Sequence, residues 1–215
     1  MRTYLRLKNR QSRKLPAEFQ DQDLRYTEEL VAAFLRQYTR PGDVVLDPFA
    51  GYGTTLIVAE AMGRVPYGVE FDARRAGYIR SQVRQAANLI HGDARQLLRY
   101  PIPTCDFSIT SPPFMAQGDP EDPFTNYTAT GAGYAAYLHD LVKIYEQVGQ
   151  LMKPGAQLVL EVSNLKGPDG VTTLAWDVAR ELAAVLRFEG EVVIGWDTYG
   201  YGYDHSYCLV FSRGE

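Results

Sequence analysis

The chain has few of the residues that build metal centres and disulfide frameworks. Its 215 residues include two cysteines and three histidines, and neither cysteine has the spacing or the histidine companions of a metal site. Cys105 and Cys208 both lie within apolar, strand-like runs. We therefore expect two buried free thiols in a reducing cytoplasm, and no bound metal.

Long apolar runs are also missing. No stretch of 18 apolar residues occurs, which excludes a membrane-spanning helix, and residues 1–8 lack the apolar core of a secretion signal. We expect a cytoplasmic protein without a membrane partner. A hydrophobic content of 46% with 22% charged residues is ordinary for a globular protein, and this length fits one domain, residues 1–215.

The chain has no excess of positive charge. A net charge of −4 argues against strong non-specific affinity for nucleic acid, which depends on neutralising phosphates. The distribution is uneven, because residues 1–14 carry six basic side chains and no acid: Arg2, Arg6, Lys8, Arg10, Arg13 and Lys14. This basic N-terminal segment, residues 1–15, is either an arm that contacts nucleic acid or a solvated tail.

Residues 44–62 hold the most informative short pattern. Val44, Val45 and Leu46 predict a short buried strand that ends at Asp47, and residues 56–62 predict a helix with a threonine as its N-cap. A strand, a glycine turn and a helix N-terminus in succession make a site at the carboxyl edge of a sheet.

The two glycines between that strand and helix give the site its character. Gly51 and Gly53 allow a tight turn and a close approach to a ligand. The free amides and the positive dipole end of the helix favour a negative group such as a carboxylate. The dinucleotide fingerprint would place a glycine at position 56, where Leu56 stands, and no Gly-Lys-Ser/Thr of a phosphate loop follows.

Helices and strands alternate along the rest of the chain, which predicts an α/β sheet with mostly parallel strands and a closing antiparallel strand pair. Further strands are predicted at residues 65–69, 88–91, 105–110 and 157–162, with the closing pair at 191–196 and 207–211; helices are predicted at 27–38, 72–84 and 138–152 and from 174, and loops at 115–133 and 164–170. A loop as long as 115–133 is usually functional or disordered; we expect it on the substrate side.

Two motifs together resemble a known family. Asp-Pro-Phe-x-Gly-x-Gly-Thr-Thr, from Asp47 to Thr55, is followed by Ser111-Pro112-Pro113-Phe114. This combination resembles the amino-methyltransferases that use S-adenosylmethionine, and more narrowly the DNA methylases that modify cytosine N4 or adenine N6. The resemblance covers about residues 17–212. It implies a class I methyltransferase (Rossmann-like) fold with S-adenosyl-L-methionine as the cofactor.

The resemblance also implies which residues bind the cofactor: Asp47, Pro48, Phe49, Gly51, Gly53, Thr54, Glu70, Phe71, Asp93 and Ala94. Glu70 ends the second strand, where an acid can take both ribose hydroxyls, and Asp93 ends the third, where it can accept from the adenine amine. Each could instead be an ordinary strand-end carboxylate. Tyr52 replaces the small residue usual between these glycines, and its ring is expected to face outward. Residues 19–29 are expected to form a wall of the pocket.

The catalytic residues implied by the resemblance are Ser111, Pro112, Pro113 and Phe114. An exocyclic amine conjugated to a base ring is a poor nucleophile, because its lone pair is delocalised. Acceptors on its protons, the Ser111 oxygen and the Pro112 carbonyl, would favour a pyramidal nitrogen. The prolines hold the backbone extended, and Phe114 offers a face on which a flipped base can stack.

The expected substrate is a nucleic-acid base, and DNA is favoured over RNA. Serine at the first motif position is commonest among cytosine-N4 enzymes of the family, so cytosine N4 is favoured over adenine N6. The alternatives are an RNA base N-methyltransferase and a non-catalytic subunit that binds S-adenosylmethionine. No large target-recognition region is present, so selectivity is slight, comes from residues 115–133, or is supplied by a second protomer or a partner. His205 and Asn164 either line the base pocket or serve as turn residues.

Overall fold

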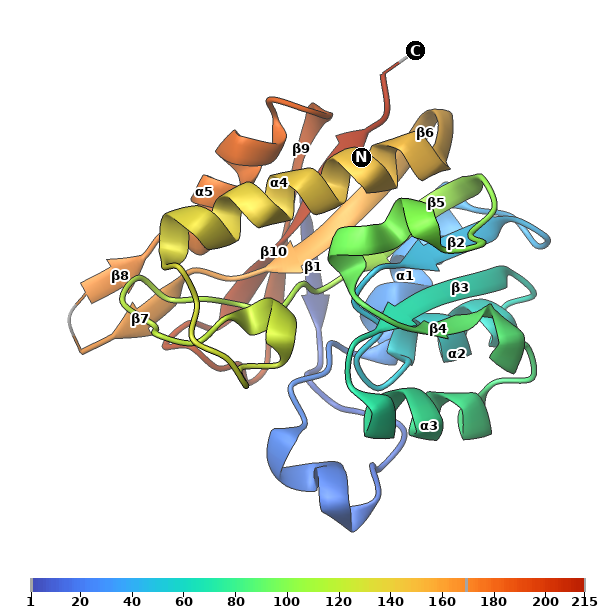
Figure 1. The fold of residues 1–215 in the computed structure, drawn as a ribbon, viewed down its shortest axis with the longest axis horizontal. Coiled ribbons are helices and arrows are strands. Elements are labelled where there is room, and N and C mark those ends of the chain that lie inside the picture. Colours follow the sequence, from blue (N-terminus) through green and yellow to red (C-terminus); the bar gives the residue numbers. More distant parts are fainter. Residues whose placement is uncertain (1, 169, 215) are drawn as a thin grey trace.

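A computed structural model describes residues 2–168 and 170–214 (Figure 1). Its centre is an eight-stranded sheet with the order β1-β9-β10-β6-β5-β2-β3-β4. The strands are β1 (Tyr4–Leu7), β2 (Val44–Asp47), β3 (Val65–Glu70), β4 (Leu89–His91), β5 (Cys105–Thr110), β6 (Met152–Val162), β9 (Arg187–Trp196) and β10 (His205–Ser212). Strands β2 to β6 run parallel, and β10 is antiparallel to both β6 and β9. The predicted α/β class and the closing antiparallel pair are confirmed.

Helices cover both faces of the sheet (Figure 1). They are α1 (Glu28–Tyr38), α2 (Thr54–Ala61), α3 (Ala73–Gln82), α4 (Tyr134–Leu151) and α5 (Leu174–Leu182), with short 3₁₀ turns η1 (Ala17–Gln22), η2 (Ala86–Asn88), η3 (Ala94–Arg99) and η4 (Pro123–Thr125). Alternate residues of β6 enter opposite cores: Leu158 and Leu160 pack with α4 and α5, and Val159 packs with α1. None of the helices in the described part of the chain has the length and apolar character that a bilayer crossing requires.

Two predictions about local structure are confirmed. Thr27 is the N-cap of α1, and its side chain accepts a hydrogen bond from the backbone nitrogen of Leu30 at 3.2 Å. Cys105 and Cys208 are buried free thiols. They lie in different cores, Cys105 on the α4 side of the sheet and Cys208 on the α1 side.

The basic N-terminal segment is neither a free arm nor a simple tail. Residues 4–7 form β1, which pairs in parallel with β9 at the edge of the sheet. Inward-facing and outward-facing residues alternate along this strand: Leu5 and Leu7 pack against the core, and Tyr4 and Arg6 face outward. The many basic residues of the segment made this alternation hard to see in the sequence.

Two further predictions were wrong in detail. The N-cap of α2 is Gly53, and its helix begins at Thr54, because the left-handed glycine turns the chain directly into the helix and no side chain caps it. The segment expected as a loop at 164–170 contains a β-hairpin, β7 (Leu165–Gly167) and β8 (Gly170–Thr172). Position 169 lies outside the described residues.

The parallel strands bring their carboxyl ends to one edge of the sheet. Asp47 ends β2, Glu70 ends β3, Ser111 follows β5 and Glu161 is the penultimate residue of β6. Because β5 lies between β2 and β6 in the sheet, the predicted cofactor loop and the predicted substrate motif are neighbours across one strand pair.

Candidate active site

The glycine loop depends on backbone conformations that side chains disfavour. Gly51 has φ +56° and Gly53 has φ +79°, both in the left-handed region. A Cβ added at Gly53 would lie 2.9 Å from Cγ2 of Ile79, so α3 also packs too closely for any larger residue. The amide of Gly51 donates to Oε2 of Glu70 at 2.7 Å, which fastens the loop to the end of β3.

Glu70 is a buried carboxylate that holds two backbone amides. Besides the bond from Gly51, its Oε1 accepts from the backbone nitrogen of Asp72 at 2.9 Å. Burial raises the pKa of Glu70 to about 7, and the two hydrogen bonds offset part of that effect. Each carboxylate oxygen keeps one lone pair for a further donor, so Glu70 can still accept a pair of hydroxyls.

Asp47 is completely buried at the end of β2. It accepts hydrogen bonds from the Thr110 hydroxyl at 2.6 Å, the Phe49 amide at 3.0 Å and the Tyr26 hydroxyl at 3.4 Å. Burial raises the pKa of Asp47 above its ordinary value, and these hydrogen bonds counteract the rise. Tyr26 lies within residues 19–29, the expected wall of the pocket, and its hydroxyl also contacts that of Thr55.

Asp93 forms an ion pair with Arg95. It caps η3, and both of its oxygens accept from the Arg95 guanidinium at 2.8 to 3.1 Å. Arg95 also reaches Asp122, 3.2 Å away in the 115–133 loop, and lies over the ring of Phe124. The expected adenine acceptor is therefore also part of an ion-pair network that anchors the substrate-side loop, and Ala94, buried beside it, begins η3.

The remaining expected cofactor residues differ in exposure. Pro48 is buried, whereas Phe71 is 41% exposed just beyond Glu70. The hydroxyl of Thr54 is buried and has no hydrogen-bond partner among the described residues. Phe49 stacks on Phe124 with ring centroids 5.9 Å apart, which begins a row of stacked rings that continues to Tyr137 and Tyr134.

Tyr52 does not face outward as expected. It is only 4% exposed, and its ring packs against Phe19 and Tyr78, at centroid distances of 5.4 and 6.5 Å. The guanidinium of Arg75 lies over the ring, 4.9 Å from its centroid. The cause is the segment around η1, which folds back over the glycine loop and covers this ring.

The Ser-Pro-Pro-Phe backbone is held by tyrosines from the following loop and helix. The Tyr137 hydroxyl donates to the carbonyl of Pro113 at 3.0 Å, and the Tyr127 hydroxyl donates to that of Phe114 at 2.7 Å. No described residue donates to the carbonyl of Pro112. The Pro112 carbonyl thus stays available, while the carbonyls of the two residues that follow it are occupied.

Sequence reasoning missed Glu161, which contacts the motif directly. The Ser111 hydroxyl donates to Oε2 of Glu161 at 3.0 Å, and the Tyr199 hydroxyl donates to Oε1 at 3.1 Å. Ser206 also hydrogen-bonds this carboxylate. Glu161 is 4% exposed, and burial raises its pKa above the ordinary value. The available signal was one acid within the apolar run Leu158–Val162.

Other residues considered from the sequence have mixed placements. The ring of Phe114 contacts that of Tyr201 at 5.5 Å, and Tyr201 has φ +59°. Asn164 is buried, and its side-chain oxygen accepts from the Ala175 amide at the start of α5, which is a structural role. His205 begins β10 and contacts Asp204, Tyr203 and Tyr207 rather than the motif.

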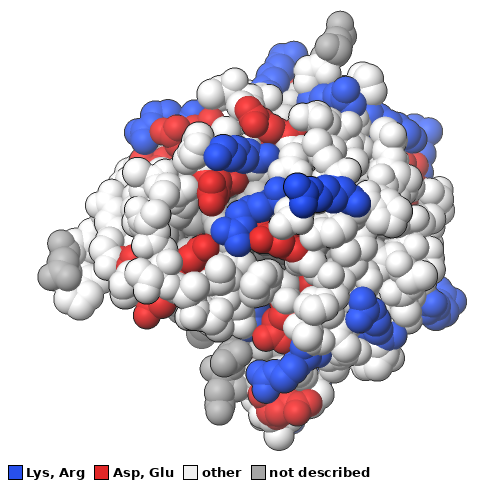
Figure 2. All heavy atoms as spheres, in the orientation of Figure 1, with Lys and Arg blue, Asp and Glu red and all other residues white. Residues whose placement is uncertain are grey.

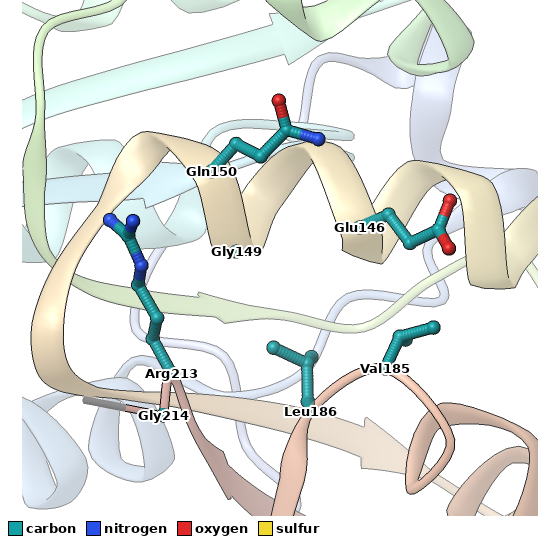
Figure 3. Close-up of a pocket in the computed structure, with 7 residues that line it drawn as sticks. All are labelled: Glu146, Gly149, Gln150, Val185, Leu186, Arg213 and Gly214. Atoms are coloured by element: carbon teal, nitrogen blue, oxygen red, sulfur yellow. The ribbon is translucent and has the colours of Figure 1, made fainter.

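Three further features lie outside this site. A hollow of about 450 Å³ lies between the end of α4 and the end of β10, at the opposite edge of the sheet; its lining includes Glu146, Leu186 and Arg213 (Figure 3). Among the described residues no group of three or more His, Cys, Asp or Glu side chains is arranged to hold a metal ion. Basic and acidic side chains are interspersed on the face seen in Figure 2.

Comparisons with known proteins give sequence matches over part of the chain. Residues 5–80 match a family model described as DNA methylase. The DNA adenine methyltransferase YhdJ of Escherichia coli is 34% identical over 87 residues, 40% of this chain and 29% of that protein. The type II methyltransferase M.MthZI of Methanothermobacter thermautotrophicus is 39% identical over 64 residues, 30% of this chain and 18% of that protein. The chain thus matches less than a third of the length of either relative.

Solved structures share the fold over most of the chain. TrmN from Thermus thermophilus superposes with a TM-score of 0.62 at 22% identity, covering 86% of this chain and 48% of that one. An rRNA methylase from Streptococcus thermophilus gives 0.59 at 13% identity, covering 87% and 96%. These likenesses show a class I methyltransferase fold. Residues 5–80, which include the glycine loop, are thus similar to a DNA methylase family model, and most of the chain shares the class I methyltransferase fold.

Proposed function

We propose that this protein transfers a methyl group from S-adenosyl-L-methionine to an exocyclic amino nitrogen of a nucleic-acid base. The observation that carries the proposal is the hydrogen bond from Ser111 to Glu161, 3.0 Å long. It lies at the same edge of the sheet as the loop held by Glu70. In this proposal the site for the amine and the site for the adenosine share one edge of the sheet, and the neighbouring positions of β2 and β5 support that arrangement.

The residues around the glycine loop fit the cofactor by their donor and acceptor chemistry. The left-handed backbone at Gly51 leaves room for a close ligand, whereas Gly53 lets α3 pack closely against the turn. Amides at the start of α2 suit a carboxylate. Glu70 retains acceptor capacity for ribose hydroxyls, and the half-exposed Phe71 provides an apolar face for a purine. When bound, S-adenosylmethionine supplies a methyl group activated by its sulfonium.

The substrate side works by orienting the amine. Because the Ser111 hydroxyl donates its hydrogen bond to Glu161, its oxygen lone pairs are free to accept a hydrogen bond from the amine. The Pro112 carbonyl is a second acceptor. Two acceptors on one amine favour a pyramidal nitrogen with its lone pair exposed, and Phe114 gives the base a stacking face. Positioning of this kind supplies a large share of the barrier reduction.

Glu161 can also accept, by way of Ser111, the proton that the methylated nitrogen must lose. The proton can pass to the Ser111 oxygen while the serine proton moves to Glu161. Burial raises the pKa of Glu161, which makes it a better proton acceptor than an exposed glutamate. Tyr199 and Ser206 hold the carboxylate in place meanwhile.

We propose DNA cytosine N4 as the target, with adenine N6 second. Serine at position 111 supports cytosine, whereas the relative from Escherichia coli is named for adenine. A base of tRNA or rRNA is the alternative substrate, and a non-catalytic role is the remaining one.

The deciding experiment offers labelled S-adenosylmethionine with double-stranded DNA, single-stranded DNA and total RNA, followed by nucleoside analysis. We expect label in DNA, as N4-methylcytosine. The Gly53→Arg variant should lose cofactor binding in a titration, and Ser111→Ala should retain it but lose turnover. Label in RNA alone, or N6-methyladenine alone, would overturn the choice of substrate. Cofactor binding without any methylated product would support the non-catalytic role.

A further inference from the structure

The edge of the sheet formed by β1, β9 and β10 has one covered face and one open face. On the covered side Val192, Ile194 and Trp196 are buried against the α1 core. Their neighbours Val193 and Gly195 point the other way and are partly exposed.

The strand register places two rows of side chains on that open face. Tyr4, Val193 and Tyr207 are paired across the three strands in one row. Arg6, Gly195 and His205 are paired in the next row. We call these six residues the open sheet face. It borders a hollow of about 310 Å³ that Trp196 and Asp204 also line.

Aromatic rings dominate the open sheet face. His205 and Tyr207 pack edge to face, with centroids 5.4 Å apart, and Tyr203, which precedes β10, packs edge to face on His205 at 5.2 Å. Tyr4 is 58% exposed, and a Cβ on Gly195 would come within 2.4 Å of its hydroxyl, so the tyrosine lies directly over the glycine. Tyr4 is exposed and the other three rings are partly exposed, so together they offer flat faces to a ligand.

Cations flank these rings at both ends. The Lys166 ammonium from β7 lies 4.2 Å from the centroid of the Tyr203 ring. At the other end Arg6 and Lys8 are exposed, and neither forms an ion pair with a described residue. Asp204 is the acid among the residues that line the hollow, and its Oδ1 lies 3.0 Å from Nδ1 of His205.

We propose that the open sheet face binds a single-stranded nucleic-acid segment next to the target base, with bases stacked on its rings and Arg6 at a phosphate. Interleaved rings and cations are the chemistry that binds unpaired strands. Stacking of this kind is not open to the paired bases of a duplex. The net charge of −4 also disfavours a duplex, whose affinity depends on many phosphate contacts.

The position of this face suits a segment that continues from the active site. Tyr207 is paired with Val162, the last residue of β6, and His205 lies closer still to the carboxyl edge. Strands lie about 4.8 Å apart, so β10 is about 10 Å and β1 about 19 Å from β5, which ends at the Ser-Pro-Pro-Phe motif. The inference rests on the proposed function for its choice of substrate.

The test measures binding by fluorescence anisotropy with single-stranded DNA, single-stranded RNA and a duplex of the same sequence. We expect a single strand to bind more tightly than the duplex. Tyr4→Ala should weaken single-strand binding about five-fold or more, and Tyr4→Phe, which keeps the ring, should restore it. Arg6→Ala should reduce the slope of log affinity against log salt by about 0.7.

Arg187→Ala is the control. It also removes one positive charge, but Arg187 begins β9, whereas Gly195, the residue that pairs with Arg6, lies near the end of that strand. The Arg187 side chain is 75% exposed. This variant should bind like wild type. Equal binding by Tyr4→Ala and wild type, or preference for the duplex, would overturn the inference, as would absence of any binding.

A methylation assay separates this inference from the proposed function. With a long single-stranded substrate, Tyr4→Ala and Arg6→Ala should raise KM more than they change kcat, without loss of cofactor affinity. If wild type methylates nothing while Tyr4→Ala still weakens strand binding, the proposed function fails and the binding surface stands. If wild type methylates the strand and both variants keep its KM, the binding surface fails alone.

Discussion

The hydrogen-bonding role of Ser111 depends on its partner, the Glu161 carboxylate. Glu161 is buried and accepts a hydrogen bond from the Ser111 hydroxyl. Because the serine hydrogen is used in this bond, the serine oxygen can act only as an acceptor toward a ligand. A protonated Glu161 would offer a proton instead and compete for the same oxygen. In the proposed reaction, the protonation state of this buried carboxylate would therefore control whether Ser111 can accept a proton of the amine.

Turnover should depend on pH through Glu161. Because burial raises the pKa of Glu161, kcat should fall as the pH drops, with a midpoint above the ordinary pKa of a glutamate. Glu161→Gln should lower kcat by about ten- to a hundred-fold, the value of a hydrogen bond to a charged group, and remove that acid limb. Rates measured across the acid and neutral range check this; an unchanged limb in the variant would assign it to another group.

Glu70 gives a second prediction, for stability. Its pKa rises from the ordinary 4.5 to about 7 in the folded protein, so the folded state binds the proton more tightly than the unfolded chain. Stability from this group is full below pH 4.5 and is lost as the pH rises through about 7. The loss is on the order of 3 kcal/mol. In urea unfolding, wild type should weaken across this window relative to Glu70→Gln; parallel curves would contradict the assignment.

At the scale of elements, the turn into α2 depends on a residue without a side chain. Gly53→Ala would force a left-handed conformation that costs about 1–2 kcal/mol, and its Cβ would lie 2.9 Å from Ile79. We expect lower stability and weaker binding of S-adenosylmethionine, measured by urea unfolding and calorimetric titration.

Gly77→Ala is the control for that substitution. Gly77 lies inside α3, and nothing lies within 4 Å of an added Cβ. Because glycine is unfavourable within a helix, this variant should gain about 0.5–1 kcal/mol and bind the cofactor normally. Similar losses in both variants would mean that the α2–α3 packing, rather than the turn, is sensitive.

The comparison of sequence and structure is also clearest among elements. Periodicity located the parallel strands and the capped helix at Thr27, because these patterns are local. The roles of Tyr52 and Glu161 escaped it, since each depends on a partner far along the chain: Phe19 covers the first, and Ser111, 50 residues from Glu161, binds the second. Strand β1 was hidden by its charges, because only its partner β9 shows that Leu5 and Leu7 face a core.

For the whole molecule, the two thiols report on the integrity of both layers. Cys105 and Cys208 are 0% exposed and lie on opposite sides of the sheet. Burial raises the pKa of Cys105 to about 12 and that of Cys208 well above its usual range, so the reactive thiolate is scarce. Both should react with a thiol reagent at one common slow rate, set by global unfolding. Faster reaction of one would identify the layer that opens separately.

The pairing of β1 with β9 has a consequence for synthesis. Tyr4 meets Val193, 189 residues later in the chain, so this ladder has a very long sequence separation, and such contacts form late and slowly. On the ribosome, β1 must wait unpaired until its partner strand β9, residues 187–196, has emerged. The glycine loop can assemble earlier from nearby segments. A nascent chain would thus form its proposed cofactor pocket before its proposed platform for a nucleic-acid strand.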